Sequence, residues 1–322
     1  MIHDPEALTH SPSGAALDCG PQSSSSEPDN ESYLELPALI TSAASKQAYY
    51  TIRFLVDHDR RLAAYRAYAY FRWVDDRLDQ PVSDRSERLG FIARQQELVG
   101  RARHGQHRSD LTREERLVAD LIRCDDQAAS GLQSYIGHMM AVMAFDANRR
   151  GRWVTELELD QYTQHLSIAV TDALHYFIGH TYAPPPSESR YLPAMAAHLT
   201  HMLRDTFEDV AVGYFNVPRE LLEANGIDPR DVESAPYRAW VKRRVQLARS
   251  YFKQGASYLD RVKSMRCRLA GYAYMARFAG VLDAIEREEY RLRPAYPEFA
   301  SPGYALRVGG SVACNTLLRG SR

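Results

Sequence analysis

Several features that would place this chain in a common class are missing from it. Its 322 residues include only four cysteines, which are scattered and show neither metal-site spacing nor a disulfide framework: Cys19, Cys124, Cys267 and Cys314. No stretch approaches the roughly 20 apolar residues of a membrane-spanning helix, and Met1–His10 lack the apolar run of a secretory signal. We therefore expect a cytoplasmic protein whose contact with membranes is at most peripheral.

An excess of charge of either sign is missing as well. The chain has 40 Lys and Arg residues against 41 Asp and Glu residues, which gives a formal net charge of −1 at pH 7. Without bulk positive charge there is no long-range attraction toward nucleic acid, so we expect no nucleic-acid partner. The sequence also lacks a nucleotide-binding glycine motif and has few runs of β-branched residues, which argues against an extended β-sheet.

What the sequence does contain is a long segment with helical periodicity. Residues 1–32 are rich in Ser, Pro, Gly and acidic residues, and they predict a disordered tail. From about Leu36 to Arg293 the pattern is mostly helical, with Pro and Gly between roughly eight or more helices. We expect one all-α domain over residues 33–293, followed by a C-terminal tail of residues 294–322.

Two short stretches place acidic side chains beside an arginine at helical spacing. The two pairs, each four positions apart, are Asp75/Asp79 after Arg72 and Asp205/Asp209 after Arg204. Side chains at i and i+4 share one face of a helix, where like charges are mildly destabilising unless a cation binds between them. The spacing alone decides little, because chance supplies about five such pairs among 41 acids. If they face each other, the two stretches could hold Mg²⁺ ions and a diphosphate.

The setting of the second pair distinguishes it from a chance spacing. Residues 194–212 predict one helix with an apolar stripe and a second face that carries His198, His201, Asp205 and Asp209. A helix that is apolar on one side and carries acids and histidines on another suits the wall of a cavity. The alternatives are a solvated acidic helix end, and histidines that serve only as hydrogen-bonded wall residues.

These motifs, in this order, resemble the squalene/phytoene synthase family of head-to-head prenyl transferases, of which the chain looks like a divergent member. The resemblance begins at Ser45-Lys46 and covers roughly residues 42–293. It rests on both acidic motifs, on the segment around Pro218 and on a closing helix at Val281–Glu286. It implies a single-domain, all-α helical bundle of the isoprenoid-synthase type around a central apolar cavity.

The resemblance also implies roles for individual residues. Two or three Mg²⁺ ions would bind to the acids of the two motifs: Asp75, Asp76, Asp79, Asp205, Glu208 and Asp209. The substrate would contact Lys46, Tyr49, Arg53, Arg72, Ile168, His198, His201 and Arg204. The catalytic set would be Tyr68, Tyr162, Arg72 and Arg204. The residue types suit the chemistry, because carboxylates bind Mg²⁺, arginine binds phosphate and aromatic faces stabilise cations.

The chain departs from the family pattern around these motifs. The family's glutamine and asparagine before the second motif are His198 and His201 here, and two glycines are replaced by Ile168 and Thr171. The segment Gly213–Pro218 lacks the family's arginine and tyrosine. Larger side chains at 168 and 171 should narrow the cavity, so the resemblance leaves substrate length and product open.

The leading hypothesis is a Mg²⁺-dependent enzyme that joins two prenyl diphosphates of C15 or C20 length through a cyclopropylcarbinyl diphosphate. The product would be squalene-like or phytoene-like, NADPH would be needed only if that product is reduced, and the lipid product could bring the protein to a membrane. One alternative is a class I terpene cyclase that uses the same pocket on one diphosphate. Another is a non-catalytic relative, against which the retained Asp75, Asp79, Asp205 and Asp209 argue.

Overall fold

A computed structural model describes residues 27–80, 84–106, 109–125 and 130–300 of the chain. Over these residues the fold is helical, no strand forms, and only Val154 and Pro218 make an isolated β-bridge. The predicted all-α class is therefore confirmed. No helix among the described residues is long and apolar enough to span a membrane.

Twelve α-helices and three short 3₁₀ helices make up the described chain. The α-helices are α1 (Glu27–Ala44), α2 (Lys46–Leu55), α3 (Arg61–Leu78), α4 (Arg85–Arg103), α5 (Arg113–Arg123), α6 (Gly131–Arg149), α7 (Glu156–Phe177), α8 (Leu192–Arg204), α9 (Thr206–Val212), α10 (Arg219–Asn225), α11 (Ala235–Leu259) and α12 (Met265–Arg287). The 3₁₀ helices are η1 (His58–Arg60), η2 (Glu188–Tyr191) and η3 (Pro297–Ala300).

Most of the expected tails lie outside the described residues. Residues 1–26 and 301–322 are not described, whereas α1 begins at Glu27 and η3 ends at Ala300. α1 therefore begins within the expected N-terminal tail (residues 1–32), and η3 lies within the expected C-terminal tail (residues 294–322).

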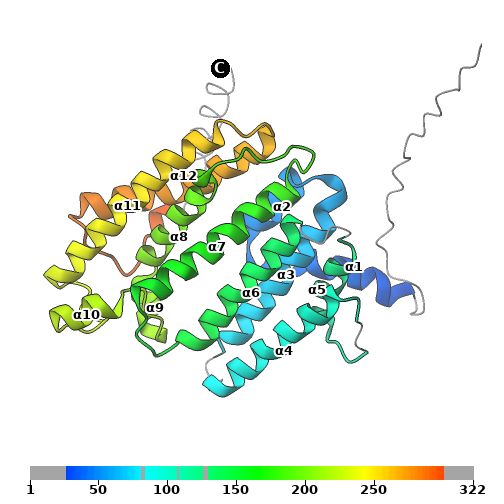
Figure 1. Cartoon of the computed structure of the whole chain (residues 1–322), viewed down its shortest axis with the longest axis horizontal. Coiled ribbons are helices and arrows are strands. Elements are labelled where there is room, and N and C mark those ends of the chain that lie inside the picture. Colours follow the sequence, from blue (N-terminus) through cyan, green and yellow to red (C-terminus); the bar gives the residue numbers. More distant parts are fainter. Residues whose placement is uncertain (1–26, 81–83, 107–108, 126–129, 301–322) are drawn as a thin grey trace, which may run out of the picture.

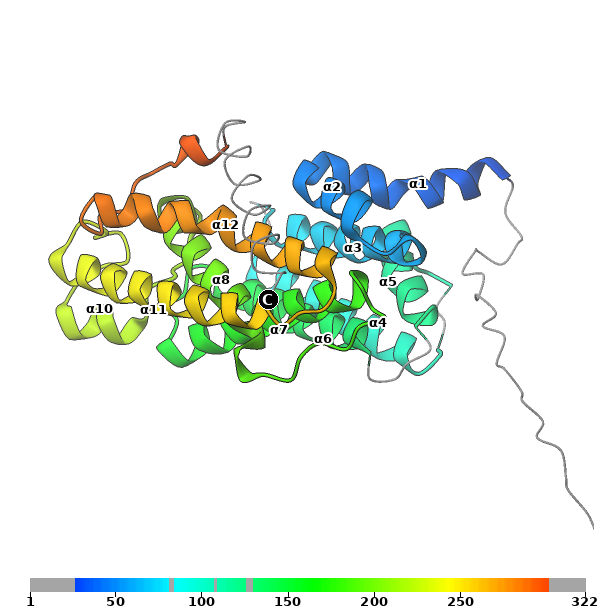
Figure 2. The same ribbon diagram turned by 90° about the horizontal axis from the view of Figure 1, so that it is seen from above.

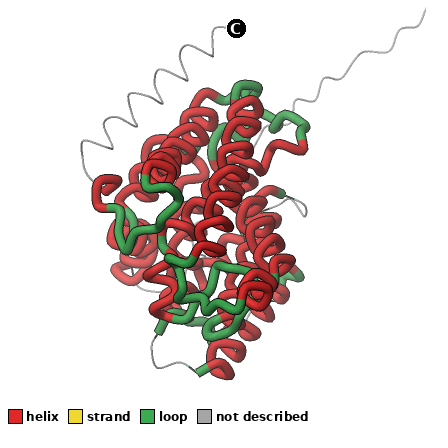
Figure 3. The backbone as a smooth tube through the Cα atoms, turned by 90° about the vertical axis from the view of Figure 1, so that its left-hand side faces the viewer, coloured by secondary structure: helices red, strands yellow, loops and turns green. Residues whose placement is uncertain are grey.

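The helices pack as a layered bundle. Figure 1 shows α6, α7 and α8 side by side, with α11 against the other side of α8. Figure 2 shows α12 together with α1 and α2 on one side of the bundle, and α4, α6 and α7 on the other. Most helices are joined by short loops, as the tube in Figure 3 shows. α3 packs against α1, α5 and α6. The backbone oxygen of Gln80, just after α3, accepts a hydrogen bond from Arg150, just after α6 (3.4 Å).

The segment 194–212, expected as one helix, is two helices with a break at Asp205. α8 ends at Arg204 and α9 begins at Thr206, and Asp205 has φ −96° and ψ 9°. The Thr206 hydroxyl donates to the backbone oxygens of Met202 (2.9 Å) and Leu203 (3.1 Å). A threonine that bonds back to the preceding turn competes with the helical ladder and bends it. Asp205 therefore lies at a helix junction, and the expectation of one continuous helix is wrong.

A buried polar network joins α3, α4 and α5 at a distance from the acidic motifs. The carboxylate of Glu115 accepts hydrogen bonds from Arg94 (2.7 and 2.8 Å) and from Gln95 (3.0 Å), and Gln95 accepts one from the Tyr70 hydroxyl (3.0 Å). Burial by itself would raise the pKa of Glu115, but these bonds and that of the Thr112 backbone lower its pKa to about 2.

We expect Glu115→Gln to lower the free energy of unfolding by about 2 kcal/mol at pH 7, because a hydrogen-bonded buried charge is lost. A carboxyl whose pKa is lowered by folding stabilises above its unfolded pKa, near 4.5, and this contribution is lost as the pH falls toward 2. Urea unfolding of both proteins between pH 7 and pH 3 should show that the difference between their free energies of unfolding decreases as the pH falls. A difference that does not change with pH would contradict a stabilising role of the Glu115 charge.

Close packing of α11 on α8 gives a second expectation. A Cβ atom at Gly255 would lie 2.6 Å from Pro193 Cγ and 3.0 Å from Pro193 N, so Gly255→Ala should destabilise by about 1–3 kcal/mol. Gly90 in α4 has nothing within 4 Å of such an atom, and Gly90→Ala should stabilise by about 0.5–1 kcal/mol through helix propensity. Thermal unfolding of the two matched variants checks this, and equal effects would show that the predicted contact is absent.

Candidate active site

The first acidic motif occupies the last turn of α3. Arg72 lies beside two of its carboxylates, with Nη1 3.4 Å from Asp75 Oδ2 and Nη2 in contact with Asp76. Asp79 caps the end of the helix and accepts a hydrogen bond from the Tyr214 hydroxyl (3.2 Å). Tyr214 follows α9, so this bond connects the first motif to the second across 135 positions of sequence.

The second motif straddles the junction of α8 and α9. Both oxygens of Asp205 are bound, by Arg204 Nε (2.6 Å) and Nη2 (2.7 Å), and by His201 Nε2 (2.8 Å). Burial would raise the pKa of Asp205, but Arg204 and His201 hold it well below its usual range. Asp209 accepts a hydrogen bond from the Asn216 side chain (2.6 Å).

Arg149, at the end of α6, connects the two motifs. Its buried guanidinium donates to Asp146 Oδ1 from Nε (2.6 Å) and to Asn216 Oδ1 from Nη1 (2.7 Å). The Tyr162 hydroxyl donates to the other oxygen of Asp146 (3.2 Å). The guanidinium carbon also lies 4.8 Å from the ring centroids of both Tyr162 and Tyr214. α6, α7 and the segment after α9 therefore meet around this one charge, and Tyr214 connects them to Asp79 at the end of α3.

Asp146, Arg149 and the roles of Tyr214 and Asn216 were not predicted from the sequence. Asp146 and Arg149 are three positions apart on one helical face, which is the only local pattern that could have pointed to them. Tyr214 and Asn216 were noted only as departures from the family pattern. Arg277 of α12 was also not predicted; burial, and then the charge of Arg204, lower its pKa, while Asp205 opposes this.

Crowded carboxylates characterise the electrostatics of this end of the bundle. Burial, and then the charge of Asp79, raise the pKa of Asp75 to about 6. Burial also raises the pKa of Asp209 to about 6, with Arg149 opposing this and Asp205 adding to it. Both carboxyls are thus harder to ionise than normal, because other carboxylates lie near them in a partly dry setting.

This donor set fits a divalent cation. Asp75, Asp79 and Asp209 offer hard carboxylate oxygens. Burial is the main cause of the raised pKa values of Asp75 and Asp209, and a bound cation would offset the repulsion by neighbouring carboxylates that adds to it. Over the described part of the chain, no three His, Cys, Asp or Glu side chains are grouped closely enough to hold a metal ion as they stand. Asp205 would have to exchange a partner to become a ligand, since Arg204 and His201 occupy both of its oxygens.

The remaining predicted residues lie at different depths. Asp76 and Glu208 are exposed beside the motifs, while Lys46 and Arg53 are exposed on α2, which packs against α1, α3 and α12. The half-buried residues are Tyr49 on α2, Tyr68 on α3 and Ile168 on α7. The backbone oxygen of Tyr49 accepts a hydrogen bond from Tyr65 of α3 (3.3 Å). The structure thus brings the acids and Tyr162 together, whereas the α2 residues belong to a neighbouring helix.

The two predicted histidines differ in environment. His201 is exposed and bound to Asp205, whereas His198 is buried edge-on against Tyr162, with ring centroids 4.8 Å apart. Neither ring nitrogen of His198 has a hydrogen-bond partner among the described residues. Burial, and then the charge of His201, hold the pKa of His198 well below its usual range, so this imidazole is neutral.

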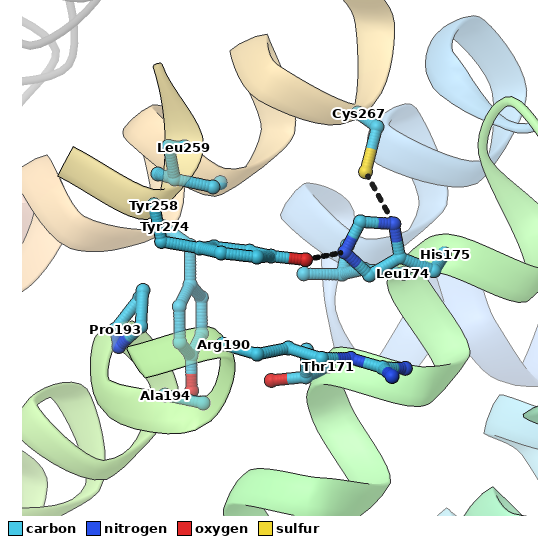
Figure 4. Close-up of a pocket in the computed structure, with 11 residues that line it drawn as sticks. Thr171, Leu174, His175, Arg190, Pro193, Ala194, Tyr258, Leu259, Cys267 and Tyr274 are labelled. Atoms are coloured by element: carbon cyan, nitrogen blue, oxygen red, sulfur yellow. Dashed lines mark hydrogen bonds between the residues drawn. The ribbon is translucent and has the colours of Figure 1, made fainter. Parts of the chain in front are cut away.

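A pocket lies between α7, α8, α11 and α12, near the N-terminal end of α8 (Figure 4). At its edge His175 lies between the Tyr258 hydroxyl, 2.8 Å from Nε2, and the Cys267 sulfur, 3.6 Å from Nδ1. α8 has 13 residues, so its ends are roughly 20 Å apart, and Asp205 follows the far end. This pocket is separate from the acidic cluster, and the expected cavity beside the motifs stays a prediction.

The chain is similar in sequence to known proteins. The sequence profile of the squalene/phytoene synthase family matches residues 41–300. The chain is 29% identical over 164 residues to a 15-cis-phytoene synthase of Synechocystis sp., which is 46% of this chain and 48% of the relative. It is 30% identical over 112 residues to a chloroplastic phytoene synthase of Narcissus pseudonarcissus, which is 32% of this chain and 26% of the relative. The matches thus span about half and about a quarter of these relatives.

Solved structures resemble the fold over nearly the whole chain. The squalene synthase HpnC of Alicyclobacillus acidocaldarius has a TM-score of 0.62 at 19% identity, covering 87% of this chain and all of that one. A dehydrosqualene synthase in complex with a ligand has a TM-score of 0.66 at 15% identity, covering 89% and 97%. At such identities the likeness concerns the fold alone, but the profile match covers well over half of the sequence. The chain therefore belongs to the squalene/phytoene synthase family.

Proposed function

We propose that this protein is a Mg²⁺-dependent prenyl transferase that condenses two prenyl diphosphates head-to-head. The reaction passes through a cyclopropylcarbinyl diphosphate to a squalene-like or phytoene-like product. One observation carries the proposal: two acidic motifs far apart in sequence converge on Arg149 and Tyr214 at one end of an all-α bundle. Membership of the family supports the same reaction class.

The acidic side chains hold the metal in this proposal. Asp75, Asp79 and Asp209 would hold the ion, and Asp205 would do so too if it gave up Arg204 or His201 as a partner. Asp76 and Glu208 are the exposed acids next to them. When bound, Mg²⁺ neutralises the diphosphate leaving group and so assists its departure from the allylic carbon. Arg72 and Arg204 lie beside these carboxylates, and each guanidinium can donate two parallel hydrogen bonds to diphosphate oxygens.

The aromatic side chains surround the allylic cation that remains when diphosphate departs. Their π faces stabilise a cation without attacking it, which suits the buried Tyr162 and the half-buried Tyr68. A neutral His198 beside Tyr162 adds no repulsion toward this cation. The α2 residues Lys46, Tyr49 and Arg53, together with Ile168 and His201, are the further substrate contacts. The substrates are of C15 or C20 length, and NADPH takes part only if the product is reduced.

Incubation of the purified protein with C10, C15 and C20 diphosphates, with and without NADPH, tests the proposal. We expect release of diphosphate that requires Mg²⁺, and a hydrocarbon with the carbon atoms of two substrate molecules. Product mass is the deciding measurement. A hydrocarbon built from a single substrate molecule would point to a cyclase instead, and absence of diphosphate release with every substrate would contradict an enzymatic role.

The metal assignment predicts the behaviour of two variants. Asp75→Asn and Asp209→Asn should each lower turnover by at least about 100-fold, because charge stabilisation of the leaving group is lost. Their melting temperatures should not fall, since each change removes a carboxylate that is crowded by others.

The matched control for these variants is Asp160→Asn. Asp160 belongs to another acidic pair at the same spacing, with Glu156, but is exposed on α7. Its substitution removes a long ion pair with Arg244 (3.9 Å) and no contact of the acidic motifs, so it should change turnover less than about two-fold. If Asp75→Asn or Asp209→Asn retained the activity of the control, the acidic cluster would not be the metal site.

A further inference from the structure

Arg149 stands out because it is buried at the convergence of the two motifs and belongs to neither. Only 6% of the residue is exposed, so its charge must be met by neighbouring groups. Asp146 meets it directly, and Asn216 accepts a second hydrogen bond while donating to Asp209. The chain of contacts from Arg149 therefore ends on a carboxylate of the second motif.

The two residues that follow Arg149 form hydrogen bonds to the ends of α3 and α9. Arg150 donates from Nε to the backbone oxygen of Val212 (3.0 Å) and from Nη1 to that of Gln80 (3.4 Å). The Gly151 amide donates to the backbone oxygen of Gly213 (2.7 Å). This segment thus contacts the chain just beyond both acidic motifs, and it fixes their separation without a metal ion.

The charge of Arg149 also acts on the carboxylates that face each other here. Its guanidinium contacts Asp146 directly and reaches Asp209 through the Asn216 side chain. A positive charge among several carboxylates reduces their mutual repulsion in the way that a bound cation does. A guanidinium does so permanently, because it does not lose its proton.

We propose that Arg149 is a positioning residue: a fixed cation that holds Asp146, Asn216 and Tyr214 in place and preassembles the site before any divalent ion binds. The proposal deepens the proposed function, on which its reference to a metal site rests. Removing the charge should leave carboxylates that repel one another, so that the protein comes to depend on added cation. A residue that served packing alone would not create such a dependence.

The test is the melting temperature of Arg149→Met, measured in EDTA and in Mg²⁺ at pH 8, where the carboxylates are ionised. We expect this variant to melt below wild type in EDTA, and its shift on adding Mg²⁺ to be at least about twice that of wild type, because binding to the native state stabilises it. Arg152→Met is the matched control, since Arg152 makes a more exposed ion pair with Glu158, and it should keep the wild-type shift. Equal shifts for Arg149→Met and wild type would overturn the proposal.

Two further variants keep the test informative if Arg149→Met folds poorly. Arg149→Lys retains the charge but cannot bridge Asp146 and Asn216 in the same way, so it should keep the wild-type Mg²⁺ shift and lose turnover. The double variant with Asp146→Asn removes the charge together with its partner and should recover stability in EDTA. Failure of that recovery would also overturn the proposal. If wild type shows no Mg²⁺ shift but Arg149→Met gains one and the double variant recovers, the metal site of the proposed function fails and the role of Arg149 stands.

Discussion

The buried charge of Arg149 is the interaction on which the arrangement of both acidic motifs depends. A guanidinium removed from water destabilises the fold unless its charge and its donors are satisfied. Asp146 and Asn216 provide this, and each is also bound to a further residue of the site, Tyr162 or Asp209. The end of α6 therefore determines where α7 and the segment after α9 lie relative to it.

The ionised carboxylates of the acidic cluster destabilise the fold, and interactions elsewhere in the bundle offset this. Raised pKa values at Asp75 and Asp209 mean that their ionised forms are disfavoured in the folded protein. Stabilising interactions lie elsewhere, in the Glu115 network of α3 to α5 and in the close packing of α11 against Pro193. This division suits a site whose charges become favourable only when a cation or a cationic intermediate is present.

Three of the departures from the family pattern contact the retained acids. Tyr214 and Asn216 occupy the segment that lacks the family's arginine and tyrosine, and they bind Asp79 and Asp209. The ring of Tyr214 lies against Arg149, so a cation from α6 is present beside the segment that has none of its own. His201 likewise binds Asp205. Tyr214, Asn216 and His201 thus each bind one of the retained acids.

The sequence by itself determined the helical class, the family and the two acidic motifs, because these depend on periodicity and on spacing within single helices. It could not determine the break at Asp205, since competition between a threonine hydroxyl and the helical ladder is decided by local geometry. Only the tertiary structure identified Asp146 and Arg149, because their partners lie on other elements: Tyr162 is 16 positions from Asp146, and Asn216 is 67 positions from Arg149. Such contacts follow from how the ends of α3, α6 and α8 meet, and no short stretch of sequence contains that information.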